Sequence, residues 1–176
     1  MTVAMNPEPM HADLMPSSIL WGAANDYCKT ARLLYENRVT AYSGVLFNLI
    51  CQSIESALKG FLRAKGRRVE DMKQNLGHNL VKALKVARDE GIEDFVKIDA
   101  NFEYHLTLAN EYNRDKEFEY YVAGLKPDMP REIVLLEGTE QLVNGIKKFC
   151  ISNVNLHHHK PTAFNPYLKQ KPAARS

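Results

Sequence analysis

The chain has 176 residues, 45% of them hydrophobic, and this length suffices for one compact core without disulfides, a metal or an obligatory partner. Its formal net charge is only +2. Acidic and basic residues balance between residues 17 and 156, and the segment from His157 onward carries only basic charges. A folded part without clustered Lys and Arg excludes a broad nucleic-acid-binding surface, because phosphate contacts supply most of the affinity of such surfaces.

The sequence lacks the features of a membrane or secreted protein. No segment approaches the roughly 18 consecutive apolar residues of a membrane-spanning helix, and the first 16 residues lack a basic start followed by an apolar run. We therefore expect a cytoplasmic protein. Cys28, Cys51 and Cys150 are odd in number, far apart and set in apolar helical contexts, which predicts buried thiols without redox or metal roles.

The fold is expected to begin after a flexible arm, residues 1–16, which contains prolines and shows no apolar periodicity. Ser17 or Ser18 is predicted to cap a first helix that ends at Glu36. Apolar residues recur there at three- and four-residue steps. The expected inward residues are Leu20, Ala24, Tyr27 or Cys28, Ala31 and Leu34.

A second helix is predicted from about Thr40 to Lys65, where proline is absent and Gly66 supplies a stop. It is long enough to be the central helix of the fold. Its apolar stripe consists of Val45, Phe47, Ile50, Ile54, Leu58, Phe61 and Leu62.

Three further segments follow: a polar loop at residues 66–77, a third helix at 78–90 closed by Gly91, and a fourth at 92–113 broken near Asp99. The expected inward residues are Leu80, Val81, Leu84 and Ala87 in the third helix, and Phe95, Ile98, Phe102, Leu106 and Ala109 or Tyr112 in the fourth.

A fifth helix is predicted to follow Pro130 and to end at about Asn153. Its inner face is expected to consist of Leu135, Leu142, Ile146, Phe149 and Cys150. No segment alternates apolar and polar residues as a strand does. The sequence therefore predicts an all-α fold at residues 17–156, an up-and-down helical bundle of four main helices plus one short extra helix. Residues 157–176 are expected to be a basic tail, disordered or bound to a partner.

Three short segments carry a resemblance to a known family. They are FNLICQSIESALKGFL at residues 47–62, LGHNL at 76–80 and EYNRD at 111–115. Together they resemble the HEPN superfamily, in which a long second helix is followed by a His-x-Leu start of the third helix and a Tyr- and Arg-bearing segment late in the fourth. The resemblance spans about residues 17–150.

The resemblance implies a helical bundle that commonly forms a homodimer and occurs in prokaryotic toxin-antitoxin systems, often beside a nucleotidyltransferase partner. Active members of the superfamily are metal-independent ribonucleases with an Arg-x(4–6)-His motif. Here Arg114 matches the arginine, but Glu119, Tyr120 and Tyr121 stand where the histidine should fall. Because His suits proton transfer near neutral pH, its loss favours a non-catalytic member.

The candidate ligand-binding residues are Lys59, Arg63, His78, Tyr112 and Arg114, which would form a polar groove for a nucleotide, an RNA end or a protein partner. Each has a plainer interpretation. Lys59 is spaced to form a surface ion pair with Glu55 on its own helix, His78 to cap or pack against the first turn of the third helix, and Arg114 to lie at a solvated helix end.

No cofactor or metal is expected. His157, His158 and His159 are consecutive residues in an unpatterned tail, where adventitious metal binding is the plain interpretation. No Gly-rich phosphate loop, HExxH motif or nucleophile elbow is present.

Three hypotheses follow. The first is a non-catalytic HEPN-like binding protein for a nucleotide, RNA or a protein partner. The second is a metal-independent endoribonuclease in which Arg114 stabilises phosphate charge while His78 or Glu119 moves protons. The third is a purely structural helical adaptor.

Overall fold

The computed structural model describes residues 15–38, 43–114 and 128–153. Within these ranges it contains six α-helices, one short 3-10 helix and no strand, so the predicted all-α class is confirmed. The expectations for residues 1–14 and for the basic tail lie outside the described residues.

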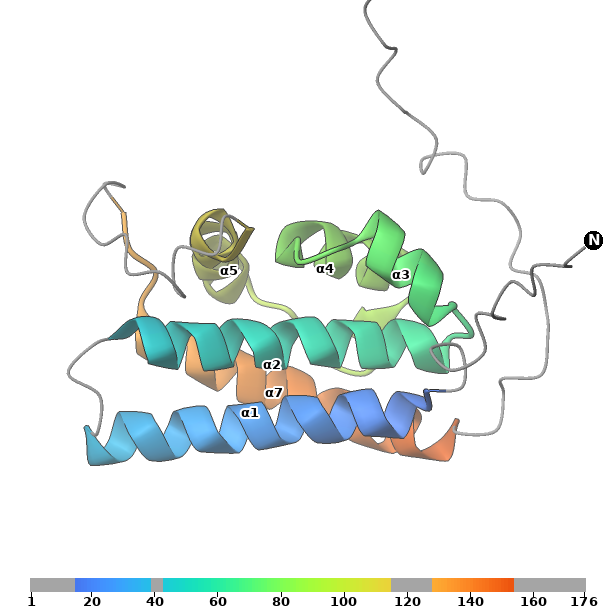
Figure 1. Cartoon of the computed structure of the whole chain (residues 1–176), viewed down its shortest axis with the longest axis horizontal. Helices are drawn as coiled ribbons and strands as arrows, with labels where there is room; N and C mark the ends of the chain where they lie inside the picture. Colours follow the sequence, from blue (N-terminus) through green and yellow to red (C-terminus); the bar gives the residue numbers. More distant parts are fainter. Residues whose placement is uncertain (1–14, 39–42, 115–127, 154–176) are drawn as a thin grey trace, which may run out of the picture.

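Three long helices pack against one another as a bundle: α1 (Ser17–Asn37), α2 (Ser43–Ala64) and α7 (Glu132–Ser152), with α7 behind the other two in Figure 1. α1 runs antiparallel to α7, since Ser17 Oγ donates to the carbonyl of Cys150 at 2.7 Å and Trp21 Nε1 donates to that of Val143 at 2.9 Å. It also runs antiparallel to α2, whose Ser53 hydroxyl donates to the carbonyl of Ala24 at 2.7 Å.

The shorter helices lie on the side of α2 that faces away from α1 (Figure 1). They are α3 (Val69–Asn75), α4 (Leu80–Asp89), the 3-10 helix η2 (Ile92–Asp94) and α5 (Ala100–Arg114). α4 and α5 run antiparallel: near one end the N–H of Leu80 donates to Asn110 Oδ1 at 2.7 Å, and near the other Arg88 forms an ion pair with Glu103 at 2.9 Å.

The core is centred on α2, whose predicted inward residues from Phe47 to Leu62 are at most 2% exposed. Phe61 of α2 extends the core by packing against Phe95 and Phe149, with ring centroids 5.7 and 5.4 Å away. The prediction that Val45 and Val81 face inward is wrong, because their exposed fractions are 48% and 38%. Counted at the helical period, Val45 falls on the face of α2 opposite its buried stripe and Val81 falls beside that of α4, so an apolar residue type alone does not place a side chain in the core.

The prediction of a polar loop at residues 66–77 is wrong, because α3 occupies most of it. Glu70 and Asp71 stand in the first turn of α3, where carboxylates favour a helix, and Met72 is buried at 2% exposure. The glycine at each end of the segment has a positive φ, +96° at Gly66 and +55° at Gly77, and these turns separate α3 from its neighbours.

The predictions for the start of α1 and for the break before α5 have different outcomes. The prediction that a serine caps α1 is wrong, because Pro16 is the capping residue and the Ser17 hydroxyl instead binds α7. The predicted break near Asp99 is confirmed, because Asp99 Oδ1 accepts the N–H of Phe102 at 2.9 Å at the start of α5. The prediction of a helix from residue 92 up to this break is wrong, because only the 3-10 helix η2 forms there and residues 95–99 lie outside any helix.

One stretch in the described residues, Gly44–Ala64 of α2, is long and apolar enough to cross a membrane. Inside this fold 67% of its apolar window is buried, as in the core helix of a globular protein, so the stretch is weak evidence for a membrane segment.

Candidate ligand-binding site

The candidate site is built on the turn between α3 and α4, residues 76–79. Gly77 adopts φ +55°, and the N–H of Asn79 donates to the carbonyl of Leu76 at 3.1 Å, which closes the turn. The Asn79 side chain then accepts the N–H of Lys82 at 2.8 Å. Asn79, rather than His78, is therefore the cap of α4, and the His78 side chain projects from the turn with 59% of its surface exposed.

Two buried asparagines of α5 fix this turn from the other side. Asn113 Nδ2 donates to the carbonyl of His78 at 3.0 Å, and Asn110 Oδ1 accepts the N–H of Leu80 at 2.7 Å. Their residue exposures are only 8% and 4%. Neither contact was predicted from the sequence, although both residues stand next to positions expected to face inward, Ala109 and Tyr112.

The centre of the site is the Glu55 carboxylate, whose side chain is 10% exposed. One oxygen accepts a hydrogen bond from Lys59 Nζ at 2.6 Å, and the other lies 3.0 Å from His78 Nδ1. We call these three residues the Glu55 cluster. The interpretation of Glu55 and Lys59 as a surface ion pair of one helix is too simple, because the carboxylate is buried and also joins α2 to the start of α4.

The cluster defines which ring nitrogen of His78 is available. An ionised carboxylate only accepts hydrogen bonds, so we assign the N–H of the neutral ring to Nδ1, which lies 3.0 Å from the Glu55 carboxylate. Nε2 is then the nitrogen that is left to meet a ligand, as an acceptor in the neutral ring and as a donor in the protonated ring.

The charges of the cluster are compensated within it. Glu55 neutralises Lys59, so the three side chains sum to zero when His78 is neutral and to +1 when it is protonated. The first turn of α4 adds little to the attraction for an anion, because the N–H groups of Leu80 and Lys82 are already bound to asparagine side chains.

Arg63, predicted at the same site, is directed elsewhere. It is 4% exposed, its Nε donates to the carbonyl of Met15 and its Nη1 to that of Arg67, both at 3.0 Å. The first bond holds the chain that precedes α1 against the end of α2, and the second holds the turn that follows α2. The prediction that Arg63 contacts a ligand gains no support from this placement.

The two α5 candidates differ from one another. Tyr112 is 4% exposed, and its hydroxyl donates to the carbonyl of Asp128 at 3.3 Å, which joins α5 to the segment before α7. Arg114 is 52% exposed, lies one residue beyond Asn113 and is 3.6 Å from Glu111. Glu119 lies outside the described residues, so its proposed proton-transfer role has no structural context here.

The cysteines are unsuited to nucleophilic chemistry. All three are buried, as predicted, and burial raises the pKa of Cys28 to about 11 and that of Cys150 to about 12. The pKa of Cys51 is raised further, first by burial and then by the charge of Glu55. The described residues contain no group of His, Cys, Asp and Glu with the arrangement of a metal site.

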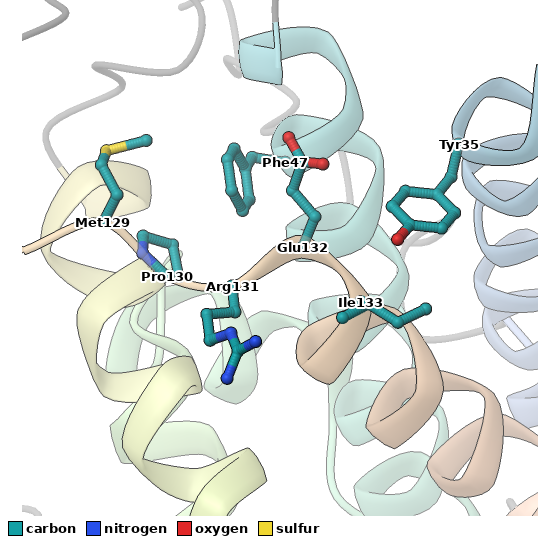
Figure 2. Close-up of a pocket in the computed structure, with 7 residues that line it drawn as sticks. All are labelled: Tyr35, Phe47, Met129, Pro130, Arg131, Glu132 and Ile133. Atoms are coloured by element: carbon teal, nitrogen blue, oxygen red, sulfur yellow. The ribbon is translucent and has the colours of Figure 1, made fainter. Parts of the chain in front are cut away.

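A separate open pocket of about 390 Å³ lies at the start of α7 (Figure 2). Apolar side chains form much of its wall. Figure 2 shows the Glu132 carboxylate between Phe47 and Tyr35, whereas the Arg131 guanidinium points away from it. Glu132 stands in the first turn of α7, where a negative charge is favourable to the helix dipole. We assign no ligand to this pocket.

Comparison of the chain with protein-family models, with curated proteins and with solved structures finds no match.

Proposed function

We propose that this protein is a HEPN-like binding protein that holds a phosphate-bearing ligand, a nucleotide or an RNA end, at the Glu55 cluster. The observation that carries the proposal is the buried Glu55 carboxylate, which holds Lys59 at 2.6 Å and a half-exposed His78 at 3.0 Å. Lys and protonated His are both donors to phosphate oxygens.

The way the site is constructed supports a role beyond stability. An ordinary ion pair four residues apart on a helix contributes roughly 0.3–0.5 kcal/mol and needs no other element. Here three elements converge: Glu55 comes from α2, His78 from the turn before α4, and Asn113 from the end of α5. Together they fix an exposed imidazole, which is the group that a ligand would meet.

The same convergence supports the HEPN resemblance. Each of the three segments that carry it contributes one residue: Glu55 from residues 47–62, His78 from 76–80 and Asn113 from 111–115. We therefore infer an up-and-down bundle of the HEPN type. The antiparallel packing of α1 against α2 and α7 is consistent with such a bundle. One short extra helix was expected, and the structure has two short elements, α3 and η2.

Binding of a fluorescently labelled, short single-stranded RNA and of a labelled nucleotide, followed by anisotropy, tests the proposal. His78→Gln and Lys59→Gln should each weaken binding by roughly tenfold or more, because each removes a charge-assisted hydrogen bond. Lys85→Gln, which removes an exposed lysine of α4, is the matched control and should leave the affinity close to that of the wild type. Equal affinities in all four proteins would exclude the Glu55 cluster as the site.

The same cluster favours a second candidate, the metal-independent endoribonuclease. Glu55 holds the ring of His78 with Nε2 outward, the orientation of a general base that accepts a proton from a 2′-hydroxyl. Arg114 would then stabilise phosphate charge. Cleavage of single-stranded RNA that persists in EDTA and is lost in both His78→Ala and Arg114→Ala would support this candidate. RNA binding without cleavage would exclude the endoribonuclease and support the non-catalytic binding protein.

The remaining proposals follow from the resemblance and the composition. We infer a cytoplasmic homodimer that also recognises a nucleotidyltransferase-type protein, within a toxin-antitoxin system. Sedimentation of the purified chain tests the dimer, and co-purification from the native host tests the partner. A co-purifying protein without RNA or nucleotide binding would instead support the helical adaptor.

A further inference from the structure

We propose that the Glu55 cluster takes up one proton when it binds a phosphate, so that His78 makes ligand binding dependent on pH. This inference rests on the proposed function and concerns the regulation of the same site.

The charge balance of the cluster is the first reason. The Lys59 charge is compensated by Glu55 at 2.6 Å, so the cluster with neutral His78 offers a phosphate no net positive charge. Protonation of His78 supplies one, while Nδ1 continues to face Glu55 Oε2 at 3.0 Å. The phosphate and the carboxylate would then lie on opposite edges of one positively charged ring.

The hydrogen-bonding capacity of the ring is the second reason. In the neutral ring the single N–H is at Nδ1 and faces Glu55, so Nε2 presents a lone pair. A fully ionised phosphodiester also presents only lone pairs, and the two repel one another. A proton on Nε2 turns this repulsion into a charge-assisted hydrogen bond.

The other charged groups around the turn do not supply this switch. Glu55 contacts His78 directly and holds Lys59, and the helix ends next to the turn carry Lys73 on α3, Lys82 on α4, and Glu111 and Arg114 on α5. Histidine is the residue type whose charge ordinarily changes between about pH 5 and 8. His78 is the histidine within this group, and 59% of its side chain is exposed to a ligand and to protons.

A phosphate ligand and a hydroxyl ligand should show opposite changes of affinity with pH. A ligand that donates a hydrogen bond to Nε2 needs the neutral ring, so its affinity would fall as the pH is lowered. A phosphate ligand needs the protonated ring, so its affinity rises.

The experiment measures the affinity of a short single-stranded oligouridylate for the full chain between pH 5.5 and 8.5 at constant salt. Phosphodiesters of this probe do not titrate in that range. In the wild type the dissociation constant should increase with pH and approach a tenfold change per pH unit at the alkaline end, the limit for uptake of one proton. Calorimetry in two buffers of different ionisation enthalpy should show the corresponding proton uptake.

His78→Gln is the decisive variant, because it alters a half-exposed side chain and leaves the fold intact. It should bind weakly with an affinity that does not change with pH, whereas Lys85→Gln should retain the wild-type profile. Wild-type binding that is independent of pH, or a His78→Gln profile with the wild-type slope, would overturn the inference and leave the proposed function standing. Absence of binding at every pH would overturn both.

Discussion

His105 shows how a single buried residue couples two helices of this fold. It is 6% exposed in α5, and its Nδ1 accepts the backbone N–H of Arg131 at 3.2 Å, just before α7 begins. An imidazole that accepts through Nδ1 must be unprotonated at that nitrogen. Burial, and then the charge of Arg131, lowers the pKa of His105 below its ordinary value of 6.5.

This environment predicts a loss of stability in mild acid. Because the folded-state pKa of His105 is lowered, the unfolded chain binds the proton more readily, and the free energy of unfolding falls as the pH drops below about 6.5. The loss levels off below the folded-state pKa. Urea unfolding at pH 7.5 and at pH 5.5 measures it.

The variant that isolates this effect is His105→Gln, which does not titrate. It should lose less stability than the wild type between the two pH values, although it begins less stable at pH 7.5. A wild-type decrease that His105→Gln reproduces in full would show that another group is responsible.

At the scale of elements, glycines set how closely the helices approach. Gly138 of α7 packs on Phe102 of α5 so tightly that an added Cβ would overlap the ring, with even the third-nearest ring atom at 2.7 Å. Gly145 is similarly close to Val96, whose Cβ would lie 2.7 Å from the added atom. These two positions let α7 lie against the chain that leads into α5.

The paired substitutions Gly138→Ala and Gly22→Ala test this packing. Gly138→Ala should destabilise the fold by about 1–3 kcal/mol, since Phe102 or α5 must move to admit the methyl group. Gly22 of α1 has nothing within 4 Å of an added Cβ, so Gly22→Ala should stabilise by about 0.5–1 kcal/mol through helix propensity. Chemical unfolding gives both values. Gly138→Ala at wild-type stability would show that α5 is not held where the structure has it.

The helices themselves were largely predictable, for a physical reason. α1, α2 and α7 are each at least 21 residues long, so their apolar period repeats several times and outweighs local exceptions. α3 has only seven residues and Met72 as its buried apolar anchor, so it offers no period to detect. The cap of α1 was mispredicted because the Ser17 hydroxyl has a partner 133 residues away, which local rules do not include.

At the scale of the whole molecule, the candidate site was predicted only in its parts. Lys59 and His78 follow from short patterns along the chain, whereas their connection through Glu55 depends on how the α3–α4 turn folds back on α2. The asparagines of α5 were missed because a buried amide gains its role from a distant partner, here the carbonyl of His78, 35 residues away. The contacts of Arg63 with the backbone carbonyls of Met15 and Arg67 were missed in the same way, because they too depend on how distant or irregular segments fold against α2.

The charge of the whole chain predicts how salt affects RNA binding. With a formal net charge of +2 and a small, internally compensated cluster, the protein should neutralise only one or two phosphates of a single-stranded RNA. The logarithm of the association constant should therefore fall against the logarithm of salt concentration with a slope of about −0.7 to −1.4.

Anisotropy titrations at several salt concentrations and at pH 6, where the site is expected to bind best, measure this slope. His78→Gln should reduce its magnitude by about 0.7, the contribution of one phosphate contact to a single strand. A slope steeper than about −3 would contradict a local site, because it requires at least four phosphate contacts. Such a slope would place the main RNA contacts on the basic residues that follow His157, whose removal would then abolish it.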